Sequence, residues 1–410
     1  MVCIHKFDNG LVLLADPIDW SESVSYSFSV PFGSIFDMVD YEGTATLVGE
    51  LISRGAGNRG NREFLEAFEY LGCDATETVG LFDMTFSASM LPENLLASIE
   101  LTADQILRPH FDISYLEFVK QKVIQEIYSL EDNPRRVMTT LQRNFLPYPF
   151  GRSGLGTVET IRRITIDNIW NAHKLYFQPN GAIFSIAGKF DFNKIQEKIN
   201  DLFSNWKPKK FVLPNEQYIG EKEIYIADDL EQTQIGVAYP SIPVGQDGYK
   251  LALCSVGIIS GGTSCRLYRE LREKRGLCYT VSALYSTLRK YAGVYCYCGV
   301  SSDKAQDALD VLINELEKLQ LGVSQDEIDR YKIGCKSELI ISQESTSGRC
   351  RDMLWDWKNL KKVQSFSEIE LSINSLTKSD VNVYLESNPP GPFHIAVLGQ
   401  KPLKFPSQKN

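Results

Sequence analysis

Two long side chains that can each form hydrogen bonds lie close together in the second half of the chain, Arg272 and Tyr279. A glycine pair precedes them, and leucines at helical spacing predict a helix over 264–275. Gly276 is typical of the residue that follows the last turn of a helix, because glycine tolerates a left-handed backbone. Alternating apolar residues then predict a strand over 277–284. We therefore expect Arg272 near the end of a helix and Tyr279 on the strand that leaves it, which fixes their relative geometry.

The residues alone leave other interpretations of this segment open. Arg266, Arg269 and Arg272 recur at every third position, as they would on a solvated helix face. A cysteine hydrolase would need a thiol such as Cys278, which precedes Tyr279, and a histidine to activate it. Because no histidine is close in sequence, Cys278 is expected to be a core residue.

The run Arg-Glu-Lys-x-Gly-Leu-x-Tyr at 272–279, with the glycine turn before it and the strand after it, resembles a motif of a known family. That family comprises the insulinase and mitochondrial-processing-peptidase enzymes, which are zinc peptidases with an inverted metal motif. In the family, an arginine and a tyrosine so arranged hold the substrate backbone beside the scissile bond. The resemblance implies that role for Arg272 and Tyr279, while Arg266 and Arg269 are expected to be solvated.

The same resemblance extends to the first half of the chain, where the family carries its His-x-x-Glu-His motif on a core helix. There two histidines bind zinc and the glutamate is the general base for the bound water. Aligned on the flanking glycines of 43–55, the two histidine positions are Thr46 and Glu50, and the base position is Gly49. The third ligand of the family, a carboxylate on a later helix, falls on Glu126.

The two nitrogen ligands and the base are therefore missing, and one carboxylate does not make a catalytic zinc site, which needs three protein ligands. We expect no metal in this chain and zinc in a partner chain. Whether Glu50 and Glu126, with the Thr46 hydroxyl, hold a harder cation or pair with basic side chains stays open.

Composition narrows the class of partner. The chain has 410 residues and a net charge of −9, which argues against a nucleic-acid or anionic-lipid partner, since both need a basic surface. No run approaches the roughly 20 apolar residues of a membrane span. The N-terminus has no secretory or transit character, so a cytoplasmic protein is expected, or an organelle matrix or stroma protein if a leader has been removed. The nine cysteines form no CxxC pair, so reduced thiols are expected.

The order of predicted elements repeats after about 200 residues. A core helix, a second helix, a glycine and a strand pair occur in each half, with Gly72 and Gly276 at matching places. We predict an α+β protein with homologous domains at 1–207 and 222–410, joined by a linker at 208–221. The resemblance implies that each domain is a β-sheet packed on one face by helices and that the two domains are related by a pseudo-two-fold axis. It also implies that the strand after Gly72 is an open sheet edge, to which an extended substrate adds as a further strand.

These observations favour a non-catalytic, substrate-binding subunit of a two-chain zinc endopeptidase that degrades or processes peptides. Its partners would be a homologous zinc-binding subunit and a peptide or unfolded polypeptide. The alternative is an inactive structural or core subunit of a larger complex. The intact Arg272 and Tyr279 pair argues against a scaffold, which would have no need of it.

Overall fold

The computed structural model describes residues 2–210, 213–218 and 220–406, which form two compact units, each with its own β-sheet. The α+β class predicted from the sequence is confirmed. The units are not continuous segments of the chain. The first contains Met1–Leu130, Ser153–Asn215 and Ile341–Val363; the second contains Glu131–Arg152, Glu216–Ile340 and Gln364–Asn410. Segment 131–152, from the first half of the sequence, belongs to the second unit, and segment 341–363, from the second half, belongs to the first unit. The predicted division at 207 and 222 did not anticipate these two segments.

The first unit contains a six-stranded sheet in the order β1-β2-β6-β3-β5-β4. Its β2–β6 pair is parallel and the other neighbours are antiparallel. The strands are β1 (Cys3–Lys6), β2 (Val12–Pro17), β3 (Val24–Val30), β4 (Asp74–Val79), β5 (Met84–Met90) and β6 (Ile183–Gly188). Because β4 lies at the edge, the expectation of an edge strand after Gly72 is confirmed.

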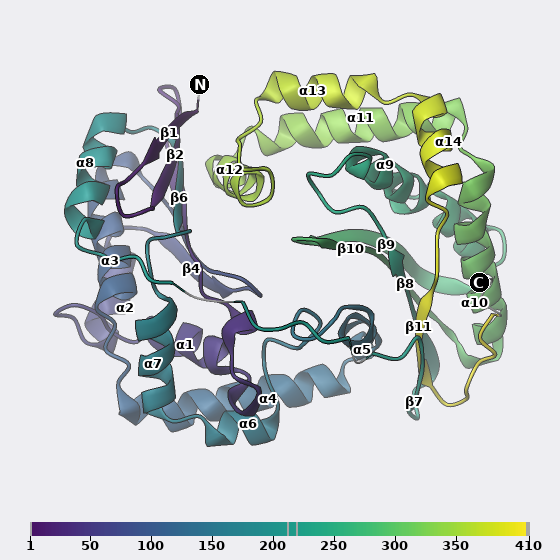
Figure 1. Ribbon diagram of the computed structural model, residues 1–410, viewed down its shortest axis with the longest axis horizontal. Helices are drawn as coiled ribbons and strands as arrows, with labels where there is room; N and C mark the ends of the chain where they lie inside the picture. Colours follow the sequence, from purple (N-terminus) through teal and green to yellow (C-terminus); the bar gives the residue numbers. More distant parts are fainter. Residues whose placement is uncertain (1, 211–212, 219, 407–410) are drawn as a thin grey trace. The chain divides into compact units, whose positions relative to one another are not determined.

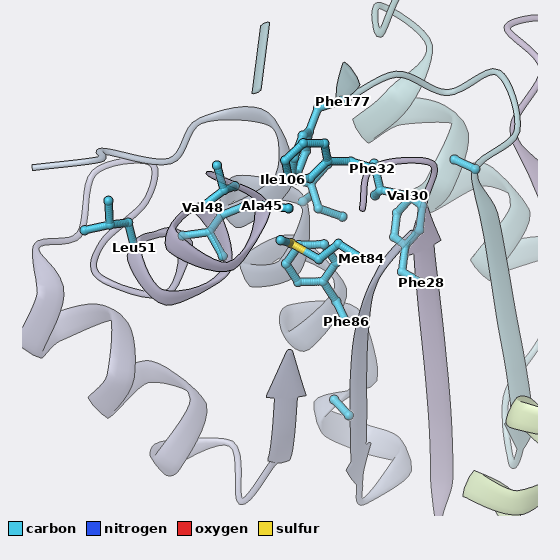
Figure 2. Close-up of a cluster of buried hydrophobic side chains, with 14 of the residues drawn as sticks. Phe28, Val30, Phe32, Ala45, Val48, Leu51, Met84, Phe86, Ile106 and Phe177 are labelled. Carbon is cyan, nitrogen blue, oxygen red and sulfur yellow. The ribbon is translucent and has the colours of Figure 1, made fainter. Parts of the chain in front are cut away.

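Helices cover one face of this sheet and enclose the main core of the unit. Figure 2 shows Ala45 and Val48 of the first helix beside Met84 and Phe86 of β5. The long helices are α1 (Thr44–Ile52), α2 (Asn61–Tyr70), α3 (Leu95–Leu107), α4 (Leu116–Asp132), α6 (Val158–Arg163), α7 (Ile166–Tyr176) and α8 (Phe192–Phe203). Short 3-10 turns are η1 (Ser34–Phe36), η2 (Val39–Tyr41), η3 (Pro92–Asn94) and η4 (Ile113–Tyr115).

The opposite face of the first sheet is covered by a helix from the second half of the sequence, α12 (Thr346–Leu360) (Figure 1). The Ser185 hydroxyl donates to the Cys350 carbonyl oxygen at 2.9 Å, and Arg349 pairs with Asp16 at 2.7 Å. The apolar contact consists of Val12, Leu14, Ile183, Ala187, Cys350, Met353 and Leu354. This sheet is therefore packed on both faces, whereas helices on one face were expected.

The second unit repeats the strand arrangement of the first. Its sheet has the order β7-β11-β8-β10-β9, and only the β7–β11 pair is parallel. This matches β2-β6-β3-β5-β4 strand for strand, so the internal repeat inferred from the sequence is a repeat of topology. The strands are β7 (Glu223–Ala227), β8 (Gln232–Pro240), β9 (Cys278–Leu288), β10 (Tyr291–Ser301) and β11 (His394–Gly399).

Helices again cover both faces of the second sheet. A helix from the first half of the sequence, α5 (Arg136–Phe145), packs Val137 and Leu141 against β8 and β11, and Arg136 pairs with Asp228 (Figure 1). The core on the other face is closed by α9 (Tyr249–Ser260), η5 (Tyr268–Glu273), α10 (Ala305–Glu317), η7 (Lys318–Leu321), α11 (Gln325–Ser342) and α14 (Lys378–Ser387). The same unit also contains η6 (Ser302–Lys304) and α13 (Phe366–Ser375). Along the described ranges, no helix is both long and apolar enough to cross a membrane.

Candidate functional site

Arg272 lies on a π-helical turn, η5, rather than on the α-helix expected over 264–275. The Lys274 N–H donates to the Arg269 carbonyl oxygen, five positions back, at 3.0 Å. Gly276 follows with φ of 55°, and its N–H donates to the Arg272 carbonyl oxygen at 3.1 Å. The predicted left-handed glycine is therefore present. A widened helical turn is uncommon in proteins and frequently occurs at functional sites.

Tyr279 lies on β9 at a β-bulge. Thr280 pairs with Gly299 and Cys278 pairs with Val300, so Tyr279 is the extra residue of the edge strand. A bulge re-aims the side chain that it carries, and Tyr279 is 77% exposed. The bulge thus presents the Tyr279 side chain to solvent at the strand end nearest η5.

The Arg272 guanidinium lies over two aromatic rings, with its Cζ 4.7 Å from the Tyr279 ring centroid and 4.8 Å from that of Tyr268. A guanidinium held over an aromatic face is attracted by the electrons of the ring. Across the part of the chain that the structure describes, Arg272 has no ion pair. Its charge and its N–H donors are therefore not taken up by a carboxylate of the same unit.

One acid on the same turn, Glu270, is occupied by other cations. Lys274 and Arg275 each donate to its carboxylate at 2.7 Å, and these hydrogen bonds lower the pKa of Glu270 to about 2. Glu270 is also a buried residue. Glu270 therefore orders the turn without competing for Arg272.

Arg266 does not belong to a solvated helix face, and that expectation was wrong. Its guanidinium binds both Glu327 carboxylate oxygens, at 2.7 and 2.8 Å, and both side chains are largely buried. Arg266 therefore anchors η5 to α11. The Arg269 side chain is 43% exposed, closer to what was expected. Cys278 is buried, as expected of a core residue.

In the first unit, α1 carries Thr46, Gly49 and Glu50, and α4 carries Glu126. The side chain that links them is Lys122, which sequence analysis missed. Its ammonium donates to both Glu50 carboxylate oxygens, at 2.6 and 2.7 Å, and lies 3.9 Å from Glu126. Lys122 and Glu126 are one helical turn apart on α4, so their spacing could have identified the pair.

The residues at these positions do not fit zinc. The Thr46 hydroxyl donates to the Gly154 carbonyl oxygen at 2.7 Å, and Lys122 places a cation between the two carboxylates. Within the described ranges, no three His, Cys, Asp or Glu side chains are grouped as metal ligands would be. Zinc prefers nitrogen and sulfur ligands, and here an oxygen pair already has its counter-ion. Glu50 and Glu126 thus pair with a basic side chain, the option left open above.

The position that the resemblance assigns to the catalytic base, residue 49, is also closed. A Cβ atom on Gly49 would lie 2.5 Å from the Val79 Cγ2 atom and 3.5 Å from the Met84 Cε atom. The absence of a side chain at residue 49 therefore lets α1 approach the edge strand β4. Glutamate could return to this position only if Val79 moved.

A pocket of about 550 Å³ lies between α1, the edge strand β4 and α4. Burial raises the pKa of the Glu77 carboxyl in its wall, opposing the effect of the hydrogen bond that Gln105 donates. The lining residues are Thr46, Gly49, Glu50, Ser53, Arg54, Asn61, Leu65, Glu77, Thr78, Val79, Lys122 and Leu155. The pocket therefore combines a pre-paired lysine with polar groups, and lacks the ligands and base of a hydrolytic metal centre.

The family models that match this chain agree with the resemblance noted from its motifs. Residues 17–157 match the model described as insulinase (peptidase family M16), and residues 163–335 match the model described as the peptidase M16 inactive domain. Together the two matched segments extend from the end of β2 into α11, and β1 and β11 lie outside them.

Individual proteins and structures give the same picture over almost the whole length. An uncharacterized zinc protease of Rickettsia felis is 26% identical over 384 residues, which are 92% of each chain. The crystal structure of a peptidase M16 inactive domain from Pseudomonas fluorescens matches with a TM-score of 0.87 at 17% identity, covering 99% of this chain and 100% of that one. A chain of complex III2 from Candida albicans matches with a TM-score of 0.81 at 16% identity, covering 98% and 96%. By its motifs, its strand topology and these matches, the chain belongs to peptidase family M16, the insulinase family.

Proposed function

We propose that this chain is the non-catalytic, substrate-binding subunit of a two-chain zinc endopeptidase. The observation that carries the proposal is the state of Arg272: its guanidinium lies over two tyrosine rings, and no carboxylate of the described ranges pairs with it. Tyr279, on its bulge, adds an exposed hydroxyl beside it. An un-neutralised arginine and an exposed tyrosine at the end of an edge strand suit a peptide backbone, which offers carbonyl oxygens.

The division of labour follows from the two units taken separately. In the first, Lys122 occupies the carboxylates at the former metal position, and Gly49 has no base. In the second, Arg272 and Tyr279 can donate hydrogen bonds to the carbonyl oxygen of a bound peptide. A homologous partner chain with an intact His-x-x-Glu-His motif would hold the zinc that activates water. This chain would bind the peptide, orient it and stabilise negative charge on the carbonyl oxygen as the bond is attacked.

The test is to mix the purified chain with a homologous chain that carries an intact His-x-x-Glu-His motif and to follow cleavage of an unfolded, fluorogenic polypeptide. Removing one donor to a developing oxyanion typically lowers kcat by about 10²–10³-fold, and we expect Arg272→Ala to do so in the mixture. Arg269→Ala is the matched control, because Arg269 lies on the same turn but pairs with Glu270. Circular dichroism checks that both variants fold.

Two results would contradict the proposal. A mixed enzyme that keeps full activity with Arg272→Ala has no use for this arginine. Cleavage by the chain alone in excess metal chelator would mean that its own residues are catalytic.

A second candidate is a proteolytically inactive core subunit of a larger complex. The observation that favours it is the fold shared with a chain of Candida albicans complex III2. The un-neutralised charge of Arg272 favours the first candidate, because a scaffold gains nothing from leaving an arginine unpaired. Affinity purification from the native cell separates the two: recovery of a zinc-binding homologue supports the peptidase subunit, and recovery of a respiratory complex supports the scaffold.

A further inference from the structure

The second ring under Arg272 belongs to a residue to which the peptide-binding motif gives no role. Tyr268 precedes Arg272 by four positions on the π-helical turn η5, and its ring centroid lies 4.8 Å from the arginine Cζ. Tyr279 approaches the same guanidinium from the edge strand β9 at 4.7 Å. Two elements of the second unit therefore contribute one ring each to a single cation.

The backbone under Tyr268 is firmly held. Leu267 and Leu271 on either side of it are fully buried in the core of the second unit. The Leu277 N–H closes the turn by donating to the Leu271 carbonyl oxygen at 2.8 Å. Arg266 directly precedes Leu267, and its guanidinium donates hydrogen bonds to both carboxylate oxygens of Glu327. Since the turn cannot rotate without exposing two leucines, the half-buried Tyr268 ring has a defined position.

Holding an arginine by its face differs from holding it by a salt bridge. A carboxylate would use the N–H edge of the guanidinium, which is the edge that recognises oxygen acceptors. An aromatic ring instead uses the flat face and leaves the N–H edge available. A long side chain with no partner would be spread over many rotamers and would lose that freedom on binding. Two rings restrict Arg272 beforehand and leave its donors unoccupied.

We propose that Tyr268 is a positioning residue: together with Tyr279, it pre-orders the Arg272 guanidinium so that its N–H edge meets a peptide carbonyl oxygen. The inference rests on the proposed function for its ligand, since the carbonyl is that of the bound peptide. The ordering of Arg272 by Tyr268 is a property of this chain alone. The ring matters and the hydroxyl does not, so Phe can replace Tyr268 and an aliphatic residue cannot.

The first experiment needs no partner. The full chain is labelled with ¹³C and ¹⁵N in arginine, and the Arg272 side-chain signals are assigned by their loss in Arg272→Lys. We expect ring-current-shifted signals in the native chain that are kept in Tyr268→Phe and move toward random-coil positions in Tyr268→Leu. Tyr70→Leu, the same substitution at an exposed tyrosine of the first unit, is the control and leaves them in place. Unchanged signals in Tyr268→Leu would overturn the proposal.

The second experiment measures peptide cleavage by the mixed two-chain enzyme. A cation–π contact at a solvated site corresponds to about a two- to fivefold change in an equilibrium constant. We expect kcat/KM to fall about two- to fivefold in Tyr268→Leu, with recovery in Tyr268→Phe. Equal loss in both variants, or none in either, would refute the positioning role.

The two proposals fail in different ways. If Arg272→Ala leaves the mixture fully active while Tyr268→Leu still releases the Arg272 signals, Tyr268 orders the arginine but the proposed function is wrong. If Arg272→Ala abolishes cleavage while Tyr268→Leu changes neither signals nor activity, the function stands and the role of Tyr268 is refuted.

Discussion

Replacing Gly49 by alanine tests whether the former base position is closed. Gly49 lies inside α1, so a gain in helix propensity of about 1 kcal/mol is expected from Gly→Ala. The added Cβ, however, would lie 2.5 Å from the Val79 Cγ2 atom, and overpacking of this kind costs about 1–3 kcal/mol. Valine is branched at Cβ and stiff, so it cannot swing aside freely. The steric cost should outweigh the propensity gain, and Gly49→Ala should lower the free energy of unfolding by about 0–2 kcal/mol.

The assay must report on each unit separately, because two compact units need not unfold together. Hydrogen exchange of amides in α1 and β4 under native conditions gives the local free energy of opening. Gly334→Ala in α11 is the matched control: no atom lies within 4 Å of its added Cβ, so it should stabilise that helix by about 1 kcal/mol. In the double variant Gly49→Ala/Val79→Ala the clash is removed. Its free energy of opening should therefore be higher than the sum of the two single changes predicts.

If Gly49→Ala stabilises α1 as much as Gly334→Ala stabilises α11, then α1 and β4 are farther apart than the structure gives. A glutamate at residue 49 would meet the same Val79 methyl group, so rebuilding the metal motif would also require a smaller side chain at residue 79.

Two further changes test how the site and the units are held. Glu327→Gln should lower the stability of the second unit by about 2–3 kcal/mol at pH 7. Burial raises the pKa of the Glu327 carboxyl, but the hydrogen bonds from Arg266 and the Ser324 N–H outweigh burial and lower this pKa from 4.5 to about 2. This contribution to stability is complete above pH 4.5 and is lost as the pH falls toward 2. When unfolding is followed over pH 2.5–7, the free energies of unfolding of the native and variant chains should therefore converge in acid. A difference in stability that does not shrink in acid would refute the electrostatic origin. Leu354→Ala should cost about 2–5 kcal/mol, since this buried leucine joins α12 to the first sheet, and should speed amide exchange in α12; a cost below about 1 kcal/mol would mean that α12 contributes little to that unit.

The parts of the fold that sequence analysis predicted are those set by local pattern. Gly72 and Gly276 both adopt left-handed backbones, with φ of 57° and 55°, and each precedes the edge strand of its sheet. A glycine after a periodic apolar segment is a local signal, and it marked the same boundary in both halves. Tyr279 was placed on its strand for the same reason.

The parts that were missed depend on contacts between distant segments. The apolar face of α12 predicts burial but not which sheet it covers, since its partners Val12 and Ile183 come from the other half of the chain. The bulge at Tyr279 is a register shift against β10, and no residue type in the strand announces it. Tyr268 lies four positions before Arg272, a spacing that is informative only once the arginine is known to lack a carboxylate partner.

The position that the family resemblance assigns to the metal shows why a motif should be judged by charge as well as by ligands. Had only the two histidine positions changed, Glu50 and Glu126 would face each other as two carboxylates, which repel when both are ionised. Lys122 removes that repulsion by donating to both Glu50 oxygens and lying 3.9 Å from Glu126. An ammonium there satisfies the carboxylates as a metal ion would, but it is attached to the chain and brings no water to activate. One ammonium thus offsets one of the two carboxylate charges and holds both groups beside it without a metal.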